Sequence, residues 1–306
     1  MLALLLPLVL AQGPAPTAIG QTAYLKPQSP GKEDLFGFSV AVSGSRAVVG
    51  MPFDKSAAGG VGANPFDNSM GGAGSATIFE WNGSSWSDVA YLKAPSPSLW
   101  NYVGHSVGID GDLVVLGAPS QSGTGAAFVY RFDGTAWKYE AKLVPSSPTA
   151  KDRFGFSVDV SGQTIVIGAD GEDGSGTGVN PAVDNSLYAA GAAYVFDFDG
   201  TSWSQTAYIK APNADANDGF GRVALSGDLL VVGAEHEDSA SGGVDGNQSD
   251  NSLSNSGAVY VYRRTAGVWG HEAYLKAANT IIGHGFGASL DVDDGTIVVG
   301  AAFDNS

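Results

Sequence analysis

The sequence predicts an all-β protein, a β-propeller of about five four-stranded blades of which the last is incomplete. Three observations support this fold class. A Phe-Gly pair or its equivalent recurs at residues 36, 103, 154, 220 and 286, at intervals of 66 or 67 residues with one of 51. About fourteen residues after each pair, an apolar run ends in glycine. No segment has helical periodicity, and self-similarity at a fixed period is typical of a repeat architecture.

Each repeat contains four expected strands. The first, as in 36–42, alternates apolar with small or polar residues, which buries one face of a strand. The second is a continuous β-branched run, as in 165–167, and is typical of a strand buried on both faces. The third is aromatic and β-branched, as in 128–130, and the fourth has the pattern Ala-Tyr-Leu-Lys, as in 90–93. Repeats of this length favour propeller blades over an open β-solenoid, whose rungs are usually far shorter.

The composition restricts the classes of partner. The chain of 306 residues has 31 acidic and 15 basic residues, a net charge of −16, and 44 glycines. A negative field of this size repels nucleic acid and anionic lipid, so neither is an expected partner. Cysteine is absent, which excludes disulfides and thiolate metal sites.

The chain divides into three parts. Residues 1–11 are almost wholly apolar and end in Val-Leu-Ala, which predicts a signal peptide and export, although basic residues are missing before the apolar run. Residues 12–20 are expected to be a linker, and residues 21–306 the propeller. No other segment is long enough to span a membrane. Residues 23–26 have the fourth-strand pattern with no blade before them, and the fifth repeat stops after its second strand, so we expect further blades or domains C-terminal to the chain.

Five pairs of motifs in register resemble the FG-GAP repeat, the blade of the integrin alpha-subunit propeller and of many bacterial surface proteins. The motifs are Phe36-Gly37 with Gly50-Met51-Pro52, Val103-Gly104 with Gly117-Ala118-Pro119, Phe154-Gly155 with Gly168-Ala169, Phe220-Gly221 with Gly233-Ala234, and Phe286-Gly287 with Gly300-Ala301. The resemblance implies a propeller, calcium in some loops, and adhesion or ligand binding at the cell surface. The integrin likeness also leaves open that the chain is a fragment of a seven-bladed ring.

The loop between the second and third strands differs most between the repeats. It is long in the first, third and fourth repeats, where an acid stands four residues after the first glycine and an Asp-Asn-Ser triplet follows. The second repeat has a short loop, Gln121 in place of the acid, and no triplet. Carboxylates and amides are calcium ligands, so these loops are candidate calcium sites. The candidate ligands are Asp54, Asp67, Asn68, Glu172, Asp173, Asp184, Asn185, Glu237, Asp238, Asp250, Asn251 and Asp304.

An alternative for the same residues is turn architecture, in which Asp, Asn and Ser side chains bond their own backbone. The compact alternating Asp motif of integrin calcium loops is missing, which weakens the metal interpretation. A further Asx column, two residues before each of the first four Phe-Gly equivalents, is expected to form the turn into the first strand. Its members are Asp34, Asn101, Asp152 and Asp218. The fourth repeat is one residue shorter after Phe220, which predicts a local irregularity near Arg222.

These observations predict an exported or cell-surface scaffold for adhesion or ligand binding, with an extracellular protein or polysaccharide as its ligand. Calcium is the expected cofactor. Nothing in the sequence breaks the repeat to bring catalytic carboxylates or histidines together, so we expect no enzymatic activity. The alternatives are a structural module of a larger secreted protein and, less favoured, a propeller-based polysaccharide hydrolase or lyase.

Overall fold

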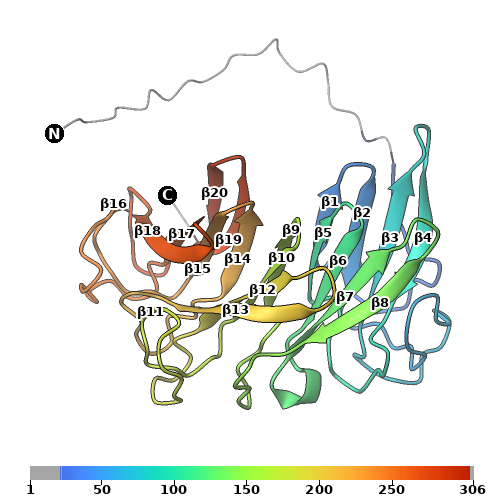
Figure 1. Cartoon of the computed structure of the whole chain (residues 1–306), viewed down its shortest axis with the longest axis horizontal. Helices are drawn as coiled ribbons and strands as arrows, with labels where there is room; N and C mark the ends of the chain where they lie inside the picture. Colours follow the sequence, from blue (N-terminus) through green and yellow to red (C-terminus); the bar gives the residue numbers. More distant parts are fainter. Residues whose placement is uncertain (1–20, 22, 304–306) are drawn as a thin grey trace, which may run out of the picture.

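The structure is a computed structural model that describes residues 21 and 23–303, and in it all pairings between named strands are antiparallel. Successive sheets follow the chain from one end to the other (Figure 1). The first sheet contains β1 to β4, at Val40–Ser43, Arg46–Met51, Ser75–Trp81 and Trp86–Leu92. The second contains β5 to β8, at Ser106–Asp110, Leu113–Ala118, Ala126–Phe132 and Trp137–Leu143, with a 3-10 turn, η1, at Gln121–Gly123.

The third and fourth sheets have the same four strands and a short extra strand at the outer edge. The third contains β9, β10, β12 and β13, at Ser157–Ser161, Thr164–Ala169, Ala192–Phe198 and Trp203–Lys210, with β11 at Gly178–Val179. The fourth contains β14, β15, β17 and β18, at Arg222–Ser226, Leu229–Ala234, Ala258–Thr265 and Val268–Lys276, with β16 at Gly243–Val244. The fifth has two described strands, β19 and β20, at Phe286–Asp293 and Thr296–Ala301.

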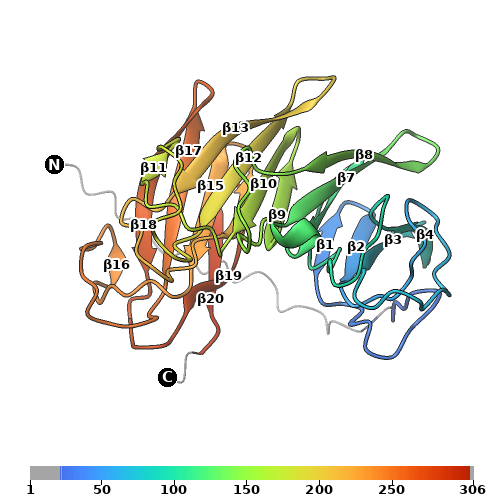
Figure 2. The ribbon, with the colours of Figure 1, turned by 90° about the horizontal axis from the view of Figure 1, so that it is seen from below.

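The sheets are the blades of a β-propeller. The first strand of each sheet contacts the first strand of the next, so that β1, β5, β9, β14 and β19 lie side by side. Figure 2 shows the blades following one another along an arc. The apolar clusters lie between neighbouring blades: one joins Val48 of β2 to Leu116 of β6, and another joins Val166 of β10 to Leu230 of β15. The predicted all-β fold class is therefore confirmed, and the core is distributed over the blade interfaces.

The expected inner strand over 36–42 is shorter in the structure. In the first blade Leu35 and Gly37 have positive φ, so the chain turns at the Phe-Gly pair and the strand begins at Val40. Residues 23–26, expected to be a fourth strand, form no strand in the structure. Within residues 21 and 23–303 we find no helix with the length and apolar character needed to cross a membrane.

In the first four blades, the approach of the next blade requires a glycine near the end of the second strand. A Cβ atom at Gly168 would lie 1.8 Å from the carbonyl oxygen of Gly221, which belongs to the next Phe-Gly pair. A Cβ atom at Gly117 would likewise lie 2.1 Å from the carbonyl oxygen of Gly155. These distances are far below van der Waals contact, and the obstructing atoms are backbone. In these four blades, the glycine that ends the apolar run is thus the point where two blades touch.

The stretch from the Phe-Gly pair to the end of the second strand is one residue shorter in the fourth repeat than in the others, and the difference lies in the turn before β14. Arg222 pairs with Gly233 just as Ser157 pairs with Gly168 in the third blade. The faces of β14 are therefore not exchanged, and Val223 and Leu225 remain buried. Gly221 lacks the positive φ that its equivalents Gly37, Gly104, Gly155 and Gly287 adopt. The irregularity predicted near Arg222 is confirmed and lies at the turn.

The two outermost blades each expose an apolar face that the other blades bury. Val40 and Val42 on β1 are 68% and 70% exposed, whereas their equivalents Val107 and Ile109 on β5 are 8% and 7% exposed. At the other end, Val298 on β20 is 63% exposed, although the equivalent valines of the four preceding blades, Val48, Val115, Val166 and Val231, are fully buried. Both faces have the composition of a blade interface without a neighbouring blade against them.

The close approach at Gly168 predicts a specific loss of stability. The Gly168→Ala variant should lower the free energy of unfolding by about 1–3 kcal/mol, because the added methyl group pushes against backbone of the next blade. Urea denaturation followed by tryptophan fluorescence measures this loss. The matched control is Gly300→Ala in the fifth blade, where the new Cβ meets only the side chain of Ser289, which can rotate away. Equal effects of the two substitutions would contradict the interpretation.

Candidate functional site

The acid of each long loop is buried at the start of that loop. Asp54, Glu172 and Glu237 are 3%, 3% and 1% exposed. In each case the backbone N–H of the acid donates to a carbonyl three residues earlier, at the end of the second strand. This turn directs the carboxylate back over the sheet, towards the fourth strand of the same blade.

A lysine and a tyrosine of the fourth strand bind that carboxylate. In the first blade Lys93 Nζ and Tyr91 Oη both lie 2.8 Å from Asp54 Oδ1. In the third blade, Lys210 Nζ lies 2.5 Å from Glu172 Oε2, and Tyr208 Oη lies 2.7 Å from Glu172 Oε1. In the fourth blade, Lys276 Nζ lies 2.7 Å from Glu237 Oε2, and Tyr274 Oη lies 2.8 Å from Glu237 Oε1. We refer to these three groups as the acid–tyrosine–lysine clusters.

The lysines of the clusters are unusually deep for charged side chains. The side chains of Lys93, Lys210 and Lys276 have no exposed surface. Burial lowers the pKa of each lysine, and the neighbouring acid acts in the opposite direction. Burial and the same carboxylates raise the pKa of the partner tyrosines. Buried charges are tolerated only when paired and hydrogen-bonded, which is what each cluster achieves.

The second blade lacks all three members of the cluster. Gln121 replaces the acid. The strand register places Lys142 opposite Phe128, as Tyr91 is opposite Thr77, so Lys142 and Val144 replace the tyrosine and the lysine. Both replacements are exposed. The acid, the tyrosine and the lysine are therefore present together or absent together, and they accompany the long loop.

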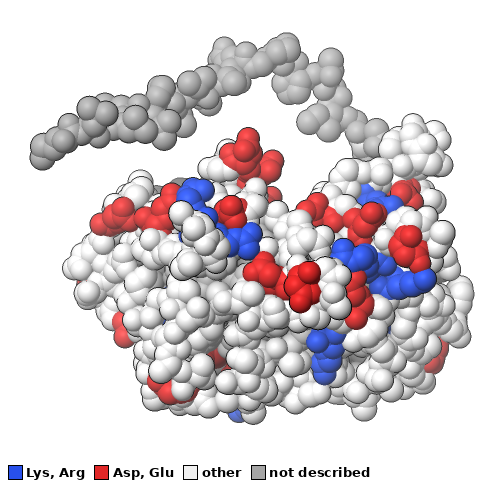
Figure 3. All heavy atoms as spheres, in the orientation of Figure 1, with Lys and Arg blue, Asp and Glu red and all other residues white. Residues whose placement is uncertain are grey.

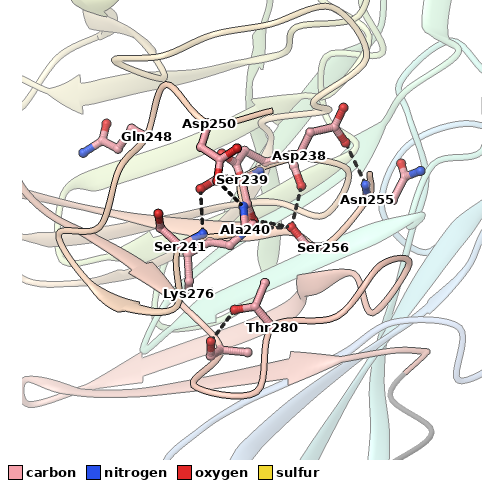
Figure 4. A network of polar contacts seen from close by, with 12 residues as sticks. Asp238, Ser239, Ala240, Ser241, Gln248, Asp250, Asn255, Ser256, Lys276 and Thr280 are labelled. Atoms are coloured by element: carbon pink, nitrogen blue, oxygen red, sulfur yellow. Dashed lines mark hydrogen bonds and ion pairs between the residues drawn. The ribbon is translucent and has the colours of Figure 1, made fainter. Parts of the chain in front are cut away.

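The aspartates of the Asp-Asn-Ser triplets bond the backbone of their own loops. Asp67 accepts from the N–H groups of Ala57 and Ser69. Asp250 accepts from Ala240 and Ser252, and Figure 4 shows its carboxylate turned towards the backbone of Ala240. Asp184 accepts from Ser175 and Ser186 in the same way. These contacts correspond to the turn architecture that the sequence left as an alternative to calcium.

The remaining calcium candidates do not gather around one point. Asp173 accepts from the N–H of Ala189, and Asp238 from that of Asn255. Asn251 donates to Asp215, and Asn68 and Asn185 are exposed. Asp304 lies outside the described residues. Across residues 21 and 23–303, no group of three or more Asp, Glu or His side chains is placed to hold a metal ion. An ammonium in contact with each buried acid does not fit a calcium ion at the same carboxylate.

Two members of the Asx column, Asp152 and Asp218, form the turns that were predicted. Asp152 accepts from the N–H of Thr149 at 2.8 Å, and Asp218 accepts from that of Asp215 at 2.9 Å. The residues on both sides of these aspartates, Lys151 and Arg153 in the third blade, have positive φ. Burial, supported by the nearby negative charge of Glu237, raises the pKa of Asp218 to about 7.

The turns and loops of the second, third and fourth blades line an open pocket of about 690 Å³. Lys151 and Arg153 come from the turn before β9, Asp170 and Tyr188 from the loop after β10, and Asn217 from the turn before β14. Figure 2 views the molecule from the side on which these loops lie. Pro119, Ser120 and Gly123 of the short second loop form another part of the wall.

The pocket combines an ion pair with an exposed aromatic ring. Arg153 Nη1 lies 2.7 Å from Asp170 Oδ2, and the ring of Phe156 lies under the guanidinium at 4.3 Å. Burial raises the pKa of Asp170 to about 6, although Arg153 acts to lower it. Tyr188 is 68% exposed. No pattern in the sequence predicted this pocket. One signal was present: the residue before each Phe-Gly equivalent differs in kind between blades, from Leu35 to Tyr102 to Arg153.

The fold and the repeated clusters define a propeller of homologous blades. The FG-GAP repeat family model matches residues 19–79, 137–196 and 203–262, more than half of the chain, and the protein belongs to the FG-GAP repeat family. No curated protein matches the sequence. Among solved structures, a mutant of the Aleuria aurantia lectin in complex with alpha-methyl-L-fucoside is similar, with 10% identity and a TM-score of 0.41. The match covers 76% of this chain and 57% of the lectin chain, and a likeness at this level concerns the fold alone.

The raised pKa of Asp218 predicts how stability depends on pH. Folded Asp218 holds its proton up to about pH 7, whereas an unfolded aspartate releases it near pH 4. Between these values the folded state binds more protons, so this group makes the free energy of unfolding fall as the pH rises. The Asp218→Asn variant carries no charge at this position. Its free energy of unfolding relative to that of the natural protein should therefore rise by on the order of 2–3 kcal/mol between pH 4.5 and pH 8.

Urea denaturation at several pH values measures this gain. The control is Asp133→Asn at an exposed turn, where hydrogen bonds from Lys138 and Thr135 hold the pKa of the aspartate below its usual value. The stability difference caused by that substitution should stay constant from pH 4.5 to pH 8. A constant difference for Asp218→Asn as well would show that Asp218 does not titrate in this range.

Proposed function

We propose that the protein is an exported or cell-surface binding scaffold, whose pocket between the second, third and fourth blades holds part of an extracellular protein or polysaccharide. The pocket carries the proposal. Its volume of about 690 Å³ is in the usual range for ligand sites, and it forms where loops from three blades converge. Binding residues are often found on loops that a rigid scaffold positions.

The chemistry of the pocket suits a polar ligand. Tyr188 offers an exposed ring that can stack on an apolar face of a ligand. Arg153 and Asp170 offer hydrogen-bond donors and an acceptor that are already held in place by their ion pair. Asn217 adds an amide to the wall. A ring for stacking beside fixed planar polar groups favours a saccharide unit or a polar peptide segment over a wholly apolar ligand.

The distribution of charge agrees with such a ligand. On the face drawn in Figure 3, Asp, Glu, Lys and Arg side chains gather in the upper half, on the side of the short β-hairpin turns. The lower half, which the long loops occupy, has few charged side chains on this face. A sparsely charged loop surface favours recognition by hydrogen bonds and stacking over long-range attraction.

Export is supported by the apolar residues 1–11. The absence of cysteine is compatible with an oxidising compartment. We propose no reaction for the pocket, because its arginine and its buried aspartate are paired with each other. Membership of the FG-GAP family, seen in integrin-type adhesion propellers, supports binding as the role.

The pocket can be tested with a panel of immobilised extracellular-matrix proteins and neutral and acidic polysaccharides, using surface plasmon resonance. For a probe that binds, Tyr188→Ala should weaken affinity by about tenfold, because a stacking contact is lost. The matched control is Phe66→Ala, which removes an aromatic ring that is 66% exposed on the long loop of the first blade, outside the pocket. Equal losses for the two variants would rule out the pocket as the binding site.

A second candidate function is a stacking module, favoured by the exposed end faces. The face with Val40 and Val42 corresponds to one side of a blade interface, and the face with Val298 to the other side. Because both sides occur on one molecule, a second copy of the chain can cover each of them in a head-to-tail arrangement. We propose this copy as the occupant.

Sedimentation equilibrium tests the stacking module. The natural protein should associate as its concentration rises, and the doubly substituted Val40→Lys, Val42→Lys protein should associate at least tenfold more weakly, since it places charge in an apolar interface. Val268→Lys is the control, at an exposed valine on the outer strand β18. A natural protein that stays monomeric at all concentrations would exclude a second copy as the occupant.

A further inference from the structure

The acid–tyrosine–lysine clusters show how each long loop is held to its blade. In the fourth blade Glu237 Oε2 accepts from Lys276 Nζ at 2.7 Å and from the N–H of Ser239 at 3.1 Å. Lys276 Nζ also donates to Ser256 Oγ at 2.6 Å. Residues 237–239 begin the loop and Ser256 lies at its end, so one ammonium ties both ends of the loop to β18. Figure 4 shows Ser256 beside Ser239 in this network.

Each cluster contains a balanced pair of charges. The carboxylate and the ammonium are both buried, and the shortest distances between them are 2.5–2.8 Å in the three blades. A buried carboxylate that stays ionised requires a cation, because an unpaired charge in the interior costs several kcal/mol. Here the cation is part of the chain.

The second blade provides a natural comparison. Gln121 keeps the backbone geometry of the acid: its carbonyl accepts from the N–H of Gly125, as the carbonyl of Glu237 accepts from that of Gly257. With a neutral side chain at this position, the second blade has Val144 where the others have lysine. The lysine is therefore present only where there is a carboxylate to neutralise, although the four blades share the same order of four main strands.

We propose that the ammonium groups of Lys93, Lys210 and Lys276 take the place of calcium in this chain, so that its long loops fold around an internal cation and need no metal. The proposal concerns these three loops and does not depend on the ligand of the pocket. It assigns to Asp54, Glu172 and Glu237 the role of lysine counter-ions.

The first experiment compares the natural protein after EDTA treatment with and without added calcium. The melting temperature should change by less than about one degree, and calorimetric titration with calcium should give no saturable heat. Stoichiometric calcium binding, or a melting temperature that rises with calcium as expected for ligand binding to the folded state, would overturn the proposal.

The second experiment measures amide hydrogen exchange in the three long loops. Lys276→Met leaves Glu237 buried without its cation, and exchange in residues 235–257 should become at least tenfold faster. Exchange in residues 170–191, whose cluster is intact, should stay as in the natural protein. The combined Glu237→Gln, Lys276→Met protein, which imitates the neutral second blade, should recover to within about threefold of the natural rate.

Unchanged exchange in Lys276→Met, or a double variant as fast as the single one, would overturn the role of the ion pair. Should Lys276→Met fail to fold, Glu237→Gln alone replaces it, and its loop should also exchange faster, because Lys276 is then buried without a partner. The calcium measurement on the natural protein stands independently of all variants.

Discussion

The contact between a glycine Cα and the carbonyl of the next blade determines the rest of this structure. At Gly168 there is no space for a single additional carbon atom, because the backbone of Gly221 is in the way. This approach brings the first strands of successive blades together and lets the valines of the second strands interdigitate in the apolar clusters between the blades. Each blade is therefore positioned by its neighbours, and a blade without a neighbour exposes valines such as Val298.

Blade packing and loop retention differ in chemistry but meet at the tyrosines. The blade interfaces are apolar and draw on all four strands, whereas the acid–tyrosine–lysine clusters are polar and use the fourth strand and the start of the loop. Tyr208 and Tyr274 belong to both. Because each loop is fixed at its base by buried charges, its outer residues need contribute little to stability. The exposed Tyr188 lies in such an outer segment, beyond the buried Glu172. A scaffold built in this way can vary its loops without disturbing its blades.

The strands could be predicted from the sequence, since period-two alternation and β-branched runs are local signals. The partners of the buried acids could not. Lys93 follows a strand in a pattern that is equally typical of a solvent-facing lysine, and Asp54 is distant from it in sequence. A bulge in the fourth strand of each of the first four blades also left no clear local signal. In β4 the extra residue is Val89, where the register shifts opposite Ile78 and Phe79. The absence of both acid and lysine from the second repeat was the one sequence clue to the pair.

The pocket could not be predicted, because its walls come from three blades whose relative position depends on packing. Its location nevertheless follows from the cluster. Where Gln121 and Val144 replace the charged pair, no long loop is retained, and the short loop with Ser120 and Gly123 forms a wall of the pocket. The blade that lacks the buried ion pair thus also lacks the long loop that would stand beside the third blade. The pocket that distinguishes this propeller from a repeat of identical blades lies where the long loop and the ion pair are both absent.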